Sequence, residues 1–264
     1  MIPLSQPQIG LWSAYLLNDD KAMFNTAECI TLRGKIDAQW LSRAVAQAVS
    51  EAQCLNVHFF RSHVAGEGMA VGMIPATETI TLSQLELPSG IASEDSFVRD
   101  WAWEDLAVPF DLEQERPCRF ALLHGESCDY LYCCIHHIAL DGYGTTLLFQ
   151  RIADIYSALA CGCDIPAADW GSFAELLDEE ASRVASGSEN ATRAYWLERL
   201  AGAKEPASFS DAKAPIAARF LRQSCRLPAI LWQQIQELAL ALKVSWADLL
   251  LAAISSQLSL YSAR

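Results

Sequence analysis

Hydrophobic and polar residues alternate along the first part of the chain in patterns that predict strands and a helix. Residues 27–33 predict a strand that ends at Gly34, and Asp37 is placed to cap a helix that follows. One apolar stripe of that helix consists of Leu41, Ala44, Val45, Ala48 and Val49. Residues 55–61 alternate as a strand does, and residues 69–74 are its predicted hairpin partner.

Two further apolar runs predict a pair of strands in the middle of the chain, followed by a helix. Residues 119–123 and 129–135 are rich in Leu, Tyr, Cys and Ile, as buried strands are. Beyond Gly142 the apolar residues fall at helical spacing, at Leu147, Leu148, Ile152, Ile155, Tyr156 and Leu159. Residues 134–143 are therefore predicted to form a strand-to-helix loop.

The pattern breaks once more toward the C-terminal end. Residues 204–215 hold Pro206 and Pro215 around Ser, Asp, Ala and Lys without an apolar period, which predicts a linker. A strand at 220–227 and two helices, with apolar residues from 231 to 242 and from 249 to 260, are expected beyond it.

Charge narrows the possible partners of the chain. With 264 residues, of which 52% are hydrophobic and 19% charged, it can bury one large core or two smaller ones. Its net charge of −13 repels nucleic-acid backbones and anionic membranes. No segment reaches about 18 uninterrupted apolar residues, and the first residues have no basic region followed by an apolar core. We expect a soluble cytoplasmic protein that binds neither nucleic acid nor membrane.

The cysteines favour a reducing compartment. The chain has nine, an odd number, with no Cys-x-x-Cys pair and no Cys/His grouping at zinc spacing. Several lie within apolar runs, where a free thiol behaves as a small hydrophobic group. No metal site is expected.

The candidate chemistry lies in the loop that begins with His136-His137 and ends with Asp141-Gly142. A histidine, with a reference pKa of about 6.5, can accept a proton near neutrality. Neighbours on a strand point to opposite faces, so His136 and His137 are expected to point in opposite directions. Gly142 permits close backbone approach. On this evidence alone, a catalytic loop and an ordinary turn after two structurally bonded histidines both stay open.

The spacing His-His-x-x-x-Asp-Gly resembles the signature of the condensation domains of nonribosomal peptide synthetases, and of relatives built like chloramphenicol acetyltransferase. Ser5, Gln8 and Trp12 resemble the first core motif of those domains, in the shortened form of siderophore synthetases such as the enterobactin synthase. Residues 109–112 (Pro-Phe-Asp-Leu) and 117–123 resemble the segment and strand before the histidine motif.

One segment departs from the family pattern. Condensation domains usually carry an Arg-His-Glu-x-Leu-Arg motif before the first strand of the hairpin at 55–61. Residues 51–56 keep its leucine, Leu55, and lose both arginines.

The resemblance implies an α+β fold in which a chloramphenicol-acetyltransferase-like lobe has a central mixed or antiparallel sheet flanked by helices. That lobe would span residues 1–203, followed by the linker at 204–215 and the beginning of a second similar lobe at 216–264. In the family the active site lies in a channel between two lobes. We therefore expect a fragment that is inactive by itself.

The resemblance also implies the reaction. A condensation domain forms an amide between a carrier-bound acyl or aryl thioester and the amine of a carrier-bound aminoacyl group, here in siderophore biosynthesis. His137 would face both reactants, and the Gly142 amide would face the thioester oxygen. Asp141 would hold the loop through an ion pair, and His136 would support it. Whether His137 acts as a base or positions the amine stays open, and we favour positioning with proton acceptance.

The same resemblance sets the expected cofactors and partners. Substrates would arrive on the 4′-phosphopantetheine of donor and acceptor carrier domains, with no cofactor bound directly. Downstream adenylation and carrier domains of the same synthetase are expected, and the chain itself should be monomeric.

Three alternatives remain. The chain could be a stand-alone CoA-dependent acetyltransferase of the chloramphenicol type, which is trimeric, although its extra length argues against this. It could be a non-catalytic lobe on which carrier domains dock, although the intact His137, Asp141 and Gly142 argue against that. It could also be an epimerization domain, because epimerization domains share the histidine motif.

Overall fold

The computed structural model describes residues 2–34, 36–64, 68–202 and 225–262. The chain divides into two compact units, Met1–Glu189 and Asn190–Arg264, and each is described by itself. The predicted linker at 204–215 and residues 220–224 of the predicted strand lie outside the described residues. The division into residues 1–203 and 216–264 therefore stays a prediction.

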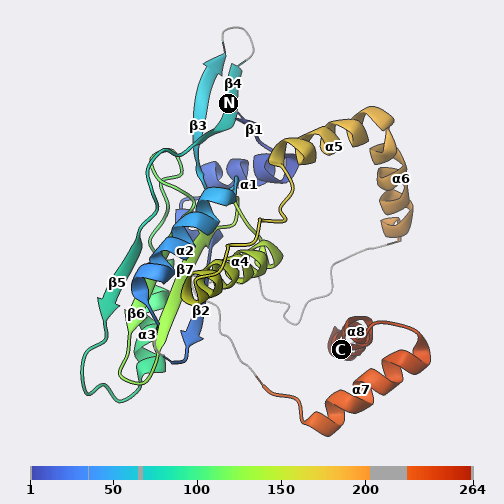
Figure 1. Ribbon diagram of the computed structural model, residues 1–264. Coiled ribbons are helices and arrows are strands. Elements are labelled where there is room, and N and C mark those ends of the chain that lie inside the picture. The colour runs from blue at the N-terminus through green and yellow to red at the C-terminus, as the bar shows by residue number, and fades with distance from the viewer. Residues whose placement is uncertain (1, 35, 65–67, 203–224, 263–264) are drawn as a thin grey trace. The chain divides into compact units, whose positions relative to one another are not determined.

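The first unit combines strands and helices in the order shown in Figure 1. Its strands are β1 (Ile2–Pro3), β2 (Asn25–Leu32), β3 (Val57–Val64), β4 (Gly68–Pro75), β5 (Leu82–Glu86), β6 (Cys118–His124) and β7 (Asp129–His136). Its helices are α1 (Gln6–Leu17), the short 3-10 helix η1 (Lys21–Phe24), α2 (Ala38–Glu51), α3 (Glu94–Leu106), α4 (Gly142–Cys161) and α5 (Phe173–Ser186). Helix α6 (Ser188–Leu200) begins at the boundary between the units.

The strands form two sheets. The larger has the order β2-β7-β6-β5, in which β5 runs parallel to β6 and the other pairs are antiparallel. The smaller has the order β1-β4-β3 and is antiparallel. Both predicted hairpins are confirmed, as β6-β7 and as β3-β4. The predicted α+β class, with a mixed sheet flanked by helices, is confirmed as well.

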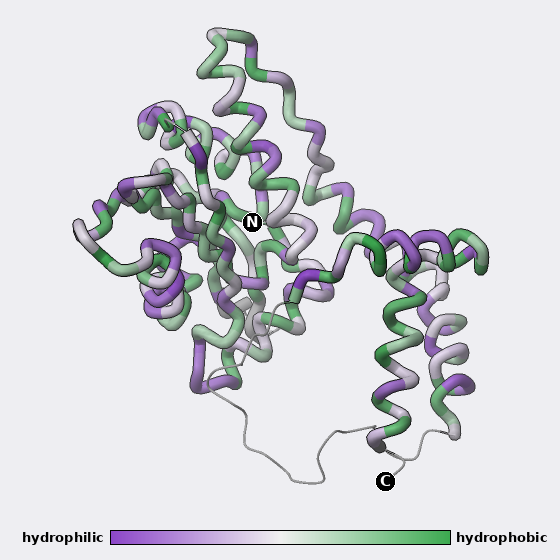
Figure 2. The backbone as a smooth tube through the Cα atoms, turned by 90° about the horizontal axis from the view of Figure 1, so that it is seen from below, coloured by the Kyte–Doolittle hydropathy of each residue, from purple (hydrophilic) through white to green (hydrophobic). Residues whose placement is uncertain are grey.

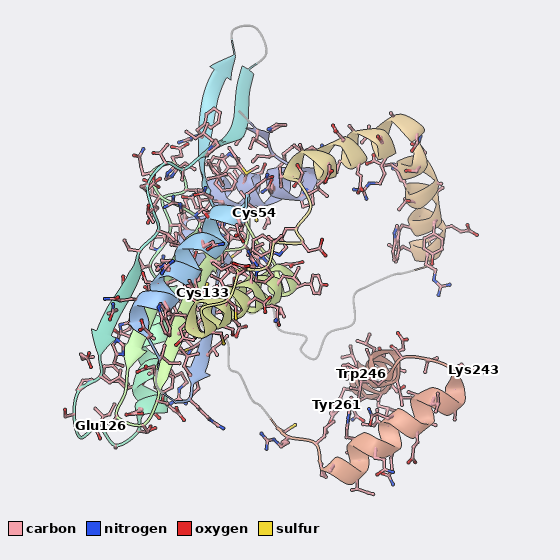
Figure 3. All side chains as sticks on the ribbon, viewed as in Figure 1. Cys54, Glu126, Cys133, Lys243, Trp246 and Tyr261 are labelled. Atoms are coloured by element: carbon pink, nitrogen blue, oxygen red, sulfur yellow. The ribbon has the colours of Figure 1, made fainter. Side chains whose placement is uncertain are left out.

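Strand β7 is buried on both faces, which explains its unbroken hydrophobic sequence. Leu131, Cys133 and Ile135 face a core shared with α2 and α4, which lie side by side across this face of the sheet (Figure 1). Figure 3 labels Cys133 in this layer. The alternate residues, Tyr130, Tyr132 and Cys134, face a second core that contains Trp12 of α1 and Phe59 of β3. The sheet therefore lies between two hydrophobic layers.

Helix α2 shows how local sequence builds the first core. The Asp37 side chain caps the helix by accepting hydrogen bonds from the N–H groups of Gln39 (2.9 Å) and Trp40 (3.0 Å). All the residues of the predicted stripe are buried: Leu41, Ala44, Val45, Ala48 and Val49.

Helix α4 ends in the left-handed conformation at Gly162 (φ 63°), where glycine has no steric cost.

A buried ion pair joins the end of α2 to α4. The Arg151 side chain, only 6% exposed, donates to both carboxylate oxygens of Glu51, at 2.6 and 2.9 Å. Nη1 of the same guanidinium donates to the Pro166 carbonyl at 2.7 Å. The hydrogen bonds from Arg151 lower the pKa of Glu51. Glu51 lies in the segment that lacks the two arginines of the family motif, and here it ties α2 to α4.

The second unit contains α7 (Ala229–Leu242) and α8 (Trp246–Ser262), which confirms both predicted helices. Lys243 makes the corner between them with a left-handed φ of 56° (Figure 3), and the rings of Trp232 and Trp246 meet edge to face at 5.4 Å. Hydrophobic residues run along both helices (Figure 2).

The described helices were compared with the length and hydropathy that a membrane span requires. None of the described helices is by itself long and apolar enough to cross a membrane. Helices α7 and α8 meet the criterion of length and composition only together, as a pair bent by 101°.

The Glu51–Arg151 pair predicts an asymmetric effect of substitution. Glu51→Ala leaves a buried guanidinium without its carboxylate, so we expect the free energy of unfolding of the first unit to fall by about 2 to 3 kcal/mol. The double change Glu51→Leu with Arg151→Met removes both charges and should recover most of this loss. Urea unfolding followed by near-UV circular dichroism measures both, and a double variant no more stable than Glu51→Ala would contradict the interpretation.

Candidate active site

The end of strand β7 and the start of helix α4 place the histidine motif at the edge of the larger sheet. His136 is the last residue of the strand, and Gly142 is the first of the helix. His136 is fully buried, whereas the His137 side chain is exposed. The predicted opposite directions of the two histidines are thus confirmed. The His137 N–H donates to the Phe24 carbonyl at 2.8 Å, which fixes the backbone where the strand ends.

His136 lies in an aromatic enclosure. Its ring meets those of Tyr15, Phe24 and Phe110 at centroid distances of 5.5, 5.8 and 6.4 Å. Its Nδ1 accepts a hydrogen bond from the Ile138 N–H at 3.2 Å. Burial, with a further contribution from the charge of His137, lowers the pKa of His136 to about 4. The ring is therefore neutral at physiological pH, with its proton on Nε2.

In the described part of the chain, one nitrogen of the His137 ring has a hydrogen-bond partner and the other, Nε2, has none. Nδ1 lies 3.0 Å from the Leu140 carbonyl oxygen. Because a carbonyl can only accept, the neutral ring holds its proton on Nδ1, and the lone pair of Nε2 stays available. His137 can thus accept a proton from a group that approaches from solvent.

Asp141 supports the loop in a different way from the one expected. Its Oδ1 accepts a hydrogen bond from the Gly144 N–H at 2.8 Å, which makes it the N-cap of α4. Its carbonyl accepts from the Thr145 N–H at 2.9 Å. None of the ion pairs among the described residues includes Asp141, so the expected ion pair stays a prediction. Within the described residues the carboxylate is held by the Gly144 N–H of the helix terminus.

Gly142 has helical backbone geometry, so the turn itself does not require glycine. A Cβ atom added at Gly142 would meet nothing within 4 Å. At Gly144, by contrast, a Cβ would lie 2.8 Å from the Leu140 side chain. A side chain at Gly144 would require the Leu140 side chain to move, whereas the space beside Gly142 is open to an approaching molecule.

The first turn of α4 also presents backbone donors. The Gly144 and Thr145 N–H groups are used by Asp141. Among the hydrogen bonds of the described residues, none takes up the N–H of Gly142 or Tyr143. Free N–H groups at a helix N-terminus attract negative charge. The structure therefore brings His137, Asp141 and Gly142 together on one loop, with His136 beneath them.

Sequence reasoning missed the part that Gln8 plays at this loop. Gln8 is 5% exposed, and its Nε2 donates to the Ile138 carbonyl at 3.1 Å. The signal was present in the spacing of Ser5, Gln8 and Trp12, which was used only as a mark of resemblance. Nothing in that spacing showed that α1 reaches the histidine motif.

No group of residues in the described part of the chain has the composition and spacing of a metal site. Two further histidines have local partners: His58 with Glu78 at 2.8 Å, and His124 with Asp129 at 3.1 Å.

Comparison with known proteins places this arrangement in a family. The family model named condensation domain matches residues 1–264. The chain is 31% identical to the dimodular nonribosomal peptide synthase of Bacillus subtilis (strain 168), over 94% of this chain and 10% of that protein. It is 28% identical to enterobactin synthase component F of Shigella flexneri, over 83% of this chain and 17% of that protein.

A solved structure supports the same assignment. The starter condensation domain of rhizomide synthetase in complex with C8-CoA matches with a TM-score of 0.72 and 30% identity, over 81% of this chain and 48% of that one. The chain thus spans a small part of these curated relatives and about half of the solved chain.

The buried neutral His136 predicts how stability depends on pH. Folding lowers the pKa of His136 from 6.5 to about 4. Between these two pH values the unfolded chain binds a proton at His136 and the folded chain does not. Stability from this group is complete above pH 6.5 and falls as the pH decreases toward 4, by up to about 3 kcal/mol. His136→Asn keeps an acceptor and does not titrate. The stability advantage of the wild type over this variant, measured by urea unfolding, should shrink over that interval; a constant difference would contradict the assignment.

Proposed function

The chain belongs to the condensation-domain family, and on that basis we propose that it joins a carrier-bound acyl thioester to the amine of a carrier-bound aminoacyl group. The observation that carries the proposal is the exposed ring of His137, whose Nε2 is free while Nδ1 is bonded to the Leu140 carbonyl. The free nitrogen lies on the same loop as the open space beside Gly142.

In this reaction His137 orients the amine and accepts its proton. An α-amino group has a pKa of about 8, so part of it is neutral near physiological pH and needs no strong base. As the amine nitrogen bonds to the thioester carbon, Nε2 of His137 takes the proton that the nitrogen loses. The carbon–sulfur bond then breaks, the carrier leaves as a thiolate, and the proton held on Nε2 converts this thiolate to the thiol. The Leu140 carbonyl keeps the ring in the tautomer that this step requires.

The first turn of α4 supplies the complementary charge. The tetrahedral intermediate carries a negative oxygen, which fixed N–H donors stabilise. The free N–H groups of Gly142 and Tyr143 at the helix terminus are suited to this task. Asp141 acts as a structural residue, because its carboxylate caps the helix that presents them.

The donor and acceptor follow from the family. Both substrates would be held on 4′-phosphopantetheine arms of carrier domains, with adenylation and further carrier domains in the same synthetase. Similarity to an enterobactin synthase component supports a place in siderophore biosynthesis, with an aryl or acyl donor. The starter domain of rhizomide synthetase was solved with C8-CoA, so fatty acyl donors should be tried beside aryl donors when the donor is identified.

His137 gives the decisive substitution. In the synthetase that carries this chain, His137→Ala should lower the rate of amide formation by about 10²- to 10⁴-fold. Loading of the carrier domains and the thermal midpoint should not change, because the side chain is exposed. His124→Gln is the matched control, since it alters a histidine on β6 outside the motif loop. Undiminished product with His137→Ala would refute the assignment, and acetyl transfer from acetyl-CoA without carriers would favour the acetyltransferase alternative.

Gly142→Ala tests whether the thioester approaches the start of α4. The added methyl meets nothing within 4 Å, so the thermal midpoint should stay the same or rise slightly. Condensation should nevertheless slow by about tenfold or more, because the methyl occupies the path of the substrate.

Gly10→Ala is the matched control for this change. It also places a methyl group in open space on a helix, on α1. It should leave the condensation rate unchanged. Equal rates for the two alanine variants would contradict substrate approach at Gly142.

A further inference from the structure

We propose that Gln8 is a positioning residue for His137 and that it acts by holding the carbonyl of Ile138, the residue next to that histidine. The part of this inference that concerns catalysis depends on the proposed function; the part that concerns the geometry of the loop does not. Ser5 and Gln8 are neighbours at the start of α1, whereas Ile138 lies 130 positions beyond Gln8, and the fold brings the three into one hydrogen-bonded chain.

The backbone around His137 is held at three points. The His137 N–H donates to the Phe24 carbonyl at 2.8 Å. The Ile138 N–H donates to Nδ1 of His136 at 3.2 Å. The Ile138 carbonyl accepts from Nε2 of Gln8 at 3.1 Å. The three partners come from three different elements: Phe24 from η1, His136 from β7 and Gln8 from helix α1.

The orientation of the Gln8 amide is determined by a second hydrogen bond. Its Oε1 accepts from the Ser5 N–H at 3.1 Å, as the third helical residue does in a capping box. Exchanging the oxygen and nitrogen would place a donor against the Ser5 N–H and an acceptor against the Ile138 carbonyl. The cap at the start of α1 therefore aims the amide N–H at the motif loop.

Helix α1 is firmly seated beneath this contact. Gln8, Trp12 and Tyr15 follow the spacing of one helix face. The Trp12 ring stacks on Phe59 at a centroid distance of 5.9 Å, and the Tyr15 hydroxyl donates to the Phe110 carbonyl at 3.1 Å. The Tyr15 ring also covers the edge of His136. The same helix face thus contacts both His136 and the peptide after His137.

Gln8→Glu separates the two hydrogen bonds of the Gln8 side chain, one to the Ser5 N–H and one to the Ile138 carbonyl. A glutamate accepts from the Ser5 N–H as glutamine does, so the capping box is kept. An ionised carboxylate cannot donate to the Ile138 carbonyl and repels it. Gln8→Met, of similar size, removes both hydrogen bonds. Ser13→Ala is the control, because it deletes a hydrogen bond of the same helix, to the Ile9 carbonyl, on the exposed side.

The first measurement uses NMR on the 264-residue chain and needs no activity. In the wild type the side-chain N–H protons of Gln8 should exchange at least about tenfold more slowly than those of the exposed Gln233. In Gln8→Glu at pH 8 the Ile138 amide should exchange about tenfold faster, and the Nδ1–H signal of His137 should weaken. Ser13→Ala should change neither. Equal exchange of Gln8 and Gln233 in the wild type would overturn the proposal, whether or not the variants fold.

The second measurement uses amide formation by the synthetase. Gln8→Glu should lower kcat about tenfold and change KM less than about twofold. Lowering the pH protonates the introduced carboxyl, which can then donate to the Ile138 carbonyl, so the deficit relative to the wild type should narrow toward acid. A pH-independent deficit would indicate a merely structural role and would overturn positioning of His137. If the wild type forms no amide while the exchange results hold, the proposed function fails and the loop contact stands.

Discussion

The burial of a neutral histidine is the constraint on which the candidate site depends. His136 sits at the end of a strand buried on both faces, among Tyr15, Phe24 and Phe110. Desolvation removes its charge, and its one accepting nitrogen is satisfied by the Ile138 N–H. Because strand neighbours alternate, this anchor leaves His137 pointing to solvent. One histidine is held by the core, and the next is exposed to solvent.

The architecture around this anchor explains why the loop can be both exposed and well ordered. The larger sheet has hydrophobic layers on both faces, one with α2 and α4 and the other with α1 and α3. The loop leaves the sheet between these layers and enters α4 at once. Its peptide groups are bonded to η1 and α1 on one side and to the cap of α4 on the other. Helices and strands therefore hold a loop whose His137 side chain faces outward.

Helix α4 is fixed at two points by side chains. The segment at residues 51–56 lacks the arginines of the family motif, and Asp141 caps α4 through the Gly144 N–H. Glu51 from that segment pairs with Arg151 of the same helix α4. The helix that presents Gly142 is thus capped at its start and tied to α2 near its middle.

The sequence alone determined β2, β3, β4, β6 and β7, the strand-to-helix loop and the family, because these follow from local periodicity and from residues at short spacing; it did not predict β1 or β5. It also determined that His136 and His137 diverge, since alternation is a local property of a strand. Tertiary structure alone decided that β5 runs parallel to β6, that Asp141 caps a helix, and that Gln8 reaches Ile138 across 130 positions. Contacts between distant segments depend on how whole layers pack, and no local pattern encodes that packing.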